Sequence, residues 1–384
     1  MAELIDHAEA VKVLRKELHQ HPELSGMEKE TPLRILAFLK AYPPDEIIYP
    51  IGETGLAVIY GSGKPGPAVL FRCELDALPI QEHNTFEHRS AYMGIAHLCG
   101  HDGHMAIMCR LAQKVFKDKP TVGKAILLFQ PAEETGEGAL RVIEDPLFKR
   151  LQPDYAFALH NLPGFKKGEI VIKKAVFAAA SKGLTLQLTG KTSHAAEPEN
   201  GISPSPALAE IIQYLSDGNA YKRNCHGFSL ITVVHAILGE IAFGVSPAHA
   251  TLRATFRSFT NQDMETMTAD ALAFINQVAA KYHLSSEVSW SEVFPSTENH
   301  PKAVAYLVKA VKSRNIPYQY IKTPFKWSED FGHFSNRCTA ALFGIGAGEN
   351  SPALHHEDYD FPDEIIEHGA AVFFEAFQII LNNE

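Results

Sequence analysis

The sequence predicts an α/β protein with a second, smaller domain inserted into the first. Three observations lead to this expectation. Apolar stretches with strand character alternate with helical patterns up to about residue 176, and the same alternation returns near the carboxyl end. Between these parts, strands alternate polar and apolar residues. A chain of 384 residues also exceeds one typical domain. We therefore expect an outer, discontinuous domain from 1–176 and 293–384, and an inserted domain over 177–292.

The outer domain shows the pattern of a mostly parallel, mixed sheet covered by helices. Its first 40 residues predict two helices, broken at His21-Pro22. Mainly apolar runs with strand character then predict strands of this sheet. A strand followed by a glycine turn is expected at Ala340–Gly348. The other predicted strands are Leu56–Tyr60, Ala68–Leu75, Ala125–Phe129 and Tyr155–Leu159, and the clearest helices are Gly103–Phe116 and Pro362–Leu381.

The inserted segment has the pattern of a small α+β domain. About four alternating strands and two helices predict helices on one face of an antiparallel sheet, a ferredoxin-like arrangement. The strands are expected at Gly183–Thr189, Phe228–His235, Ala250–Ser258 and Ser286–Ser291, and the helices at about 204–216 and 262–282.

Composition excludes several classes of function. Lys+Arg 35 against Asp+Glu 45 gives a net charge of -10, which argues against binding nucleic acid or an anionic membrane. No apolar run approaches the ~20 residues of a membrane span, and the charged amino-terminal segment predicts no signal peptide. The 5 cysteines are scattered, without a CxxC pair. A reducing, cytoplasmic location is therefore expected.

Side chains able to bind metal follow several predicted strands or begin a helix. Alone, each has an ordinary explanation: Cys99 as a small buried apolar residue, His160 as a satisfied polar group, and Glu133-Glu134 as a solvated helix start. Ligands bind at the carboxyl ends of strands in open α/β sheets. Together, Cys99-Gly-His101, Glu133-Glu134, His160 and His355-His356 therefore predict a metal site.

These segments belong to a series of motifs that covers nearly the whole chain. The sequence resembles the dinuclear metal-dependent amidohydrolases, a metallopeptidase-like family that includes hippurate hydrolase, aminoacylases, N-acetyl-diaminopimelate deacetylase and auxin–amino-acid conjugate hydrolases. The resemblance implies hydrolysis of an N-acyl amino acid to a carboxylic acid and an amino acid. The motifs are LHQHPELSGME (18–28), RCELDALPIQE (72–82), HLCGHDGHMAIM (97–108), LLFQPAEETGEGA (127–139), ALHNLPG (158–164), GKTSHAAEP (190–198), WSEDFGHF (327–334) and ALHHEDYDFPDE (353–364).

The resemblance also implies a set of ligands for two divalent metal ions per subunit. Cys99 would bridge the ions as a thiolate, and Glu133 would be the general base. Asp76 would orient a ligand. Zinc or manganese fits this donor set best, and cobalt or nickel is compatible with it. The implied ligands are Cys99, His101, Glu134, His160 and His355, whereas His97, His104 and His356 are not implied as ligands.

For the inserted domain, the resemblance implies a lid that also forms a homodimer or higher homo-oligomer. His194 would reach the substrate carbonyl, although a loop histidine is usually a surface residue. Arg257 would contact the substrate carboxylate, and an exposed strand charge explains it equally well. Two departures bear on the substrate: Glu74 stands where the family usually has Asp, and 244–247 read Gly-Val-Ser-Pro where Asn-Val-Ile-Pro is common.

The prediction is thus a cytoplasmic amidohydrolase acting on a small-molecule N-acyl amino acid. A metallo-dipeptidase or carboxypeptidase of the same fold is the alternative. The pair Cys99 and His101 favours the amidohydrolase, because the peptidase branches tend to bridge their metals with Asp. A third possibility is an inactive metal-binding scaffold protein, against which the intact Glu133 argues.

Overall fold

The computed structural model describes residues 7–383, which divide into two compact units. The first unit comprises the described residues up to Phe177, Thr297–Thr323 and the residues from Asp330 onward. The second comprises Ala178–Ser296 and Pro324–Glu329. Across residues 7–383, no helix combines the length and the apolar character needed to cross a bilayer.

An eight-stranded mixed sheet forms the centre of the first unit, in the order β1-β2-β4-β3-β5-β16-β6-β15. Strands β4, β3, β5 and β16 run parallel to one another, while β1, β2 and β6 are antiparallel to a neighbour. The expected mostly parallel mixed sheet is confirmed. The strands are β1 Glu46–Ile51, β2 Gly55–Gly61, β3 Ala68–Glu74, β4 Lys124–Gln130, β5 Tyr155–Pro163, β6 Ile170–Ile172, β15 Tyr318–Tyr320 and β16 Thr339–Gly348.

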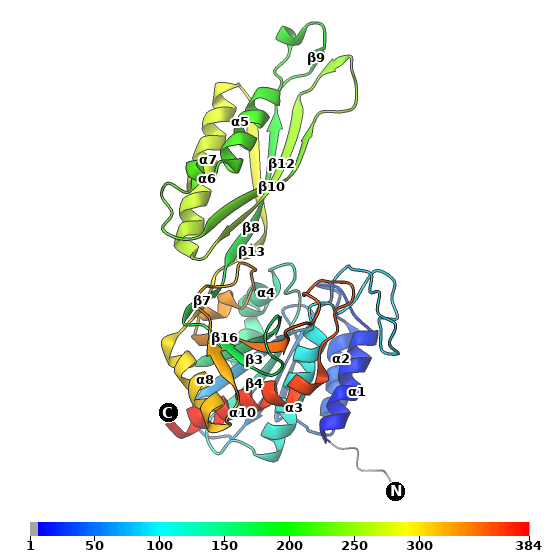
Figure 1. Cartoon of the computed structure of the whole chain (residues 1–384), viewed down its shortest axis with the longest axis vertical. Coiled ribbons are helices and arrows are strands. Elements are labelled where there is room, and N and C mark those ends of the chain that lie inside the picture. Colours follow the sequence, from blue (N-terminus) through cyan, green and yellow to red (C-terminus); the bar gives the residue numbers. More distant parts are fainter. Residues whose placement is uncertain (1–6, 384) are drawn as a thin grey trace. The chain divides into compact units, whose positions relative to one another are not determined.

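Helices of the first unit share one apolar core with the sheet (Figure 1). Helix α10 (Ile366–Asn383) contacts both α3 (His101–Lys117) and α8 (Pro301–Ser313), and α1 (His7–Gln20) packs on α3. Alternate strand residues such as Val69, Phe71 and Cys73 point into this core. The remaining helices are α2 Glu30–Leu39, α4 Gly138–Glu144 and α9 Gly332–Ser335, with 3-10 turns at Pro146–Arg150 and Asp363–Ile365.

The second unit is a four-stranded antiparallel sheet in the order β10-β12-β8-β13, with α5 (Ser205–Ser216) and α7 (Asn261–Lys281) packed on it (Figure 1). Its chain order, β8-α5-β10-β12-α7-β13, is the βαββαβ order of ferredoxin-like domains. Its strands are β8 Ala180–Thr189, β10 Ser229–Leu238, β12 His249–Ser258 and β13 Ser285–Phe294. Its smaller elements are β9 Ser193–His194, β11 Val245–Ser246, α6 Gly218–Tyr221 and a 3-10 turn at Pro198–Asn200. Strands β7 (Ala175–Ala178) and β14 (Thr297–Asn299) pair in a separate two-stranded sheet; β14 belongs to the first unit, and β7 spans the unit boundary after Phe177.

Three stretches lie in a different unit from the one the sequence predicted: Phe177 belongs to the first unit, 293–296 belong to the second, and so does one further segment. Residues 324–329 were assigned to the outer domain, yet they belong to the second unit. The backbone N–H of Ala179 donates to the carbonyls of Phe325 and Trp327, each at 3.1 Å. Arg257 Nη1 also donates to the Lys326 carbonyl at 3.0 Å. These contacts join residues far apart in sequence, so no local pattern reveals them.

Candidate metal centre

The predicted metal-binding residues follow parallel strands of the first unit. Glu133 and Glu134 come three and four residues after β4, His160 lies within the last part of β5, and His355 lies in the loop after β16. Because β4, β5 and β16 belong to one parallel set, these side chains gather at a single edge of the sheet. The fold thus brings distant segments to one place.

Cys99 and His101 reach this edge from the turn before α3. Gly100 makes the turn with φ of 89°, a left-handed conformation that favours glycine. A Cβ at this position would lie 2.7 Å from Oδ1 of Asn161, so the approach also excludes a larger residue. His101 is the first residue of α3 and is fully buried. This turn therefore fixes the spacing of the two side chains.

All five predicted ligands and Glu133 come together in the structure. Three overlapping groups have their possible ligand atoms within 4.8 Å of one another. Cys99 belongs to two of these groups, which suits a ligand shared between two ions. The groups are Cys99 with His101 and His160, Cys99 with Glu134 and His355, and His101 with Glu133 and Glu134.

The imidazoles are oriented as metal ligands usually are. His101 Nδ1 donates to the backbone carbonyl of Asp76 at 2.8 Å, which leaves the lone pair on Nε2. That Nε2 is buried and makes no hydrogen bond among the described residues. His160 Nδ1 donates to the Asn161 carbonyl at 2.9 Å, and its Nε2 lies 3.6 Å from Cys99 Sγ. The residues present therefore fit bound divalent cations.

The electrostatic field of the cluster favours added positive charge. Burial alone would lower the pKa of His101, but Asp76, Glu74 and Glu134 outweigh burial and raise the pKa to about 10. Burial and the carboxylates of Glu134 and Glu133 raise the pKa of the Cys99 thiol well above its usual value. A thiolate at Cys99 thus requires a cation beside it.

The Glu133-Glu134 loop is held by buried carboxylates from two other motifs. Ala132 has φ of 49°, an uncommon value for alanine, and its N–H donates to Glu28 Oε1 at 2.8 Å. The Glu134 N–H donates to Asp76 Oδ2 at 2.9 Å. Asp76 therefore orients His101 through its carbonyl and the Glu134 backbone through its carboxylate. Its predicted orienting role agrees with these contacts.

The other histidines of these motifs lie in different surroundings. His355 and His356 are both half exposed, but His355 Nε2 lies 3.6 Å from Glu134 Oε1, whereas His356 Nδ1 lies 3.9 Å from Asp358. His97 is buried beside His19, with ring centroids 6.5 Å apart. His104 is engaged at both ring nitrogens. In this arrangement His355, rather than its neighbour, approaches the cluster.

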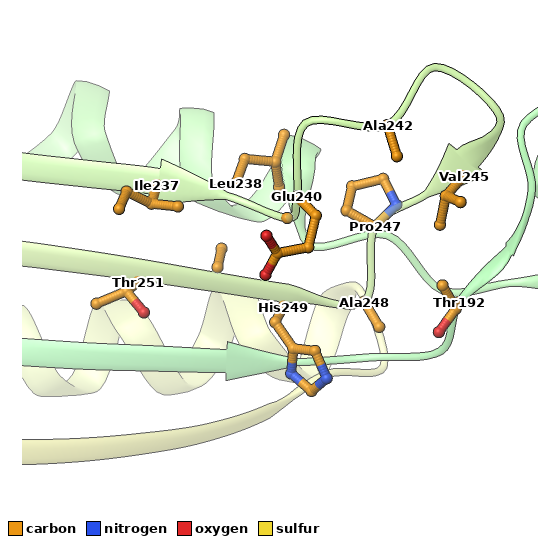
Figure 2. Close-up of a pocket in the computed structure, with 12 residues that line it drawn as sticks. Thr192, Ile237, Leu238, Glu240, Ala242, Val245, Pro247, Ala248, His249 and Thr251 are labelled. Carbon is orange, nitrogen blue, oxygen red and sulfur yellow. The ribbon is translucent and has the colours of Figure 1, made fainter.

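His194 and Arg257 belong to the second unit. His194 is exposed on β9, and its Nδ1 accepts from the Ala196 N–H at 3.1 Å. It pairs with Val245 of β11, which borders a pocket at the ends of β10 and β12 (Figure 2). Arg257 Nη1 donates to Ser328 Oγ at 3.1 Å, besides its bond to the Lys326 carbonyl.

A buried ionic cluster next to α3 was missed by the sequence reasoning. Arg15 of α1 is 2% exposed and binds Asp360 and Asp363, each at 2.7 Å. His19 contacts Asp102 at 2.8 Å and Glu82 at 3.1 Å. The sequence signal was that every acidic member of the cluster and His19 lie in motifs quoted above, whereas Arg15 lies outside them.

Comparison with known proteins identifies the family. Residues 70–378 match the model of peptidase family M20/M25/M40. The chain belongs to this family. A hydrolase of Staphylococcus aureus is 30% identical over 373 residues, covering 94% of this chain and 96% of the relative. One of Staphylococcus epidermidis is 29% identical over 372 residues, with the same coverage of 94% and 96%. The chain is thus an M20 family hydrolase.

Solved structures agree with this assignment. A putative aminohydrolase from methicillin-resistant Staphylococcus aureus has a TM-score of 0.85 at 25% identity, covering 96% of each chain. The Bacillus subtilis YXEP protein, described as a dinuclear metal-binding peptidase of the M20 family, has a TM-score of 0.84 at 24% identity and covers 98% of this chain and 99% of its own. The similarity to the Bacillus subtilis protein shows that the two chains share a fold.

Proposed function

We propose that this M20 hydrolase is a dinuclear metal-dependent amidohydrolase acting on N-acyl amino acids. The observation that carries the proposal is the convergence of a thiol, three imidazoles and two carboxylates from four segments of the chain. Cys99, His101, Glu134, His160 and His355 would hold two divalent ions, with zinc or manganese as the best match to the donors. Cys99 at the shared position supports the amidohydrolase over the peptidase alternative.

Glu133 supplies the proton transfers in this proposal. Glu133 Oε2 and Glu134 Oε1 each lie 3.9 Å from His101 Nε2, and Glu134 Oε1 also lies 3.6 Å from His355 Nε2. Glu134 thus approaches two imidazoles, and Glu133 borders the ligands. Bound ions would polarise the scissile carbonyl and acidify a water molecule. Glu133 accepts the proton of that water as it attacks the carbonyl carbon. It then donates the proton to the nitrogen of the leaving amino acid as the C–N bond breaks.

Release of free amine from a substrate panel tests the function. The panel contains N-acetyl and N-benzoyl amino acids and, for the alternative, unblocked dipeptides. We expect hydrolysis of N-acyl amino acids, its loss after treatment with a chelator, and its return with Mn²⁺ or Zn²⁺. Preferential cleavage of dipeptides would favour the peptidase, and no release from any compound with either ion would favour the scaffold protein.

We further propose that the second unit is a lid that forms a homodimer. Strand β10 lies at an edge of its sheet and has ten residues, an unusually long free edge. Its apolar side chains Val234 and Ile237 are 60% and 51% exposed. Antiparallel pairing of two β10 strands would cover both edges by two-fold symmetry.

The oligomeric state can be measured by light scattering after size-exclusion chromatography. We expect a dimer for the wild type and a monomer for Val234→Lys combined with Ile237→Lys. Lys222 lies outside β10, so Lys222→Glu serves as a charge-changing control that should stay dimeric. A monomeric wild type at micromolar concentration would contradict the dimer.

A further inference from the structure

A chain of buried charged side chains lies behind the metal-binding cluster in the first unit. Its members are Asp330, Arg72, Glu74 and His104, each at most 1% exposed. Arg72, Glu74 and Asp330 themselves have no role in the chemistry proposed so far. Buried ions need such pairing, because an isolated buried charge is strongly unfavourable. The inference drawn from this chain rests on the metal site of the proposed function.

Direct contacts link these four buried side chains in series. Arg72 Nη2 donates to Asp330 Oδ1 at 2.5 Å, and Arg72 Nη1 donates to Glu74 Oε1. Glu74 Oε2 accepts from His104 Nδ1 at 2.6 Å. Each acidic group therefore has a cationic or N–H partner. The longer side chain of Glu74, noted above as a departure from the usual Asp, contacts Arg72 and His104 together.

The contacts of His104 fix its tautomer. The Nδ1 proton faces the Glu74 carboxylate, while Nε2 accepts from the backbone N–H of Asn161 at 3.1 Å. Glu74, His101 and His104 have donor atoms within 4.8 Å and could by distance alone suggest a further metal site. With both nitrogens of its ring engaged, His104 has no lone pair left for a metal ion.

The two ends of this series of buried contacts lie next to segments that carry candidate metal ligands. At one end, His104 holds the N–H of Asn161, the residue next to His160, and the His104 and His160 ring centroids are 4.9 Å apart. At the other end, Asp330 Oδ2 accepts from the Ala139 N–H at 2.8 Å. Ala139 follows the loop that contains Glu134. One set of buried contacts thus connects β5 with the loop after β4.

We propose that His104, oriented by Glu74, is a positioning residue that sets the place of the metal ligand His160. His104 acts through the Asn161 backbone and does not touch substrate. Loss of a partner that orients a metal ligand typically weakens metal binding by about 10–100-fold. The same range is expected here for at least one of the two ions.

Two substitutions at His104 separate its two contacts. His104→Asn can keep a donor toward Glu74, but its shorter side chain cannot also bring its acceptor oxygen to the Asn161 N–H. The longer side chain of His104→Gln can place an acceptor there. Metal-free protein of each variant is titrated with Co²⁺, and the visible absorption of bound cobalt reports occupancy and coordination. We expect about 10–100-fold weaker binding and an altered spectrum for His104→Asn, with partial recovery in His104→Gln.

Met108→Ala is the matched control, since Met108 is fully buried in the same helix and forms no part of the chain of contacts. It should lower the free energy of unfolding without changing cobalt affinity. Wild-type affinity and spectrum in folded His104→Asn would overturn the proposal, as would equal affinities for the Asn and Gln variants. Because cobalt binding is read without substrate, failure of the proposed reaction would be seen separately.

Discussion

Replacing Glu133 by Gln tests the assigned general base. The change preserves size and keeps an acceptor oxygen near His101 Nε2, which lies 3.9 Å from Glu133 Oε2, but the amide cannot accept the proton of water. Proton transfer by a positioned side chain contributes about 10²–10⁴ in rate. That range corresponds to about 2.7–5.5 kcal/mol of lost transition-state stabilisation. Because Glu133 is not among the proposed ligands, metal content should stay near wild type.

The assay is kcat for amine release from the best N-acyl amino acid, with bound metal quantified on the same preparation. Glu137→Gln is the control, because Glu137 is an exposed carboxylate on the same loop that pairs with Arg141. Its activity should stay near wild type. If Glu133→Gln retains wild-type kcat with both ions bound, Glu133 is not the base.

Three further predictions concern other parts of the molecule. Cys99→Ala should abolish activity and remove at least one equivalent of metal, and undiminished binding of two ions would show that Cys99 is only a buried apolar residue. His194→Ala should lower kcat by about 10²–10³ without changing metal content. If this variant is mixed with Glu133→Gln under verified subunit exchange, partial activity would show that His194 acts across a dimer. Absence of any rescue would exclude action across a dimer. Burial alone would lower the pKa of His19, but Asp102 and Glu82 outweigh burial and raise the pKa from 6.5 to about 9. Protonated His19 therefore stabilises the fold below pH 6.5, and this contribution is lost as pH rises through about 9. Denaturant unfolding should therefore show a larger cost of His19→Gln below pH 6.5 than above 9, and a cost independent of pH would contradict the ionic contribution.

The strands that the sequence predicts well are those with enough consecutive residues to show a clear apolar pattern. Strand β3 is buried at all seven positions, and its apolar start at Ala68–Phe71 is visible without any knowledge of its partners. Strand β6 and strand β15 have only three residues each, too few for a pattern to appear. Strand β1 has six residues, but its exposed and buried positions follow no regular pattern, so the sequence did not predict it.

The candidate site divides in the same way. Cys99, His101 and Glu134 sit in compact motifs, so their chemistry is visible in the sequence. The groups that hold them are joined across long separations: Arg15 meets Asp360 over 345 residues, and Arg72 meets Asp330 over 258. Such pairs depend on strand order and on how the chain crosses the sheet. Neither can be read from local spacing.

This division has a physical basis in what each group must do. A metal ligand has to be a particular chemical type, which restricts the residues at its position and makes a recognisable motif. A group that orients a ligand needs only a donor or acceptor at the correct distance, so many residue types serve and the constraint lies in geometry. Glu74 and His104 illustrate the second case: the distances between their donor atoms and those of His101 could suggest a metal site, and only the positions of Asn161 and Arg72 reveal a different role.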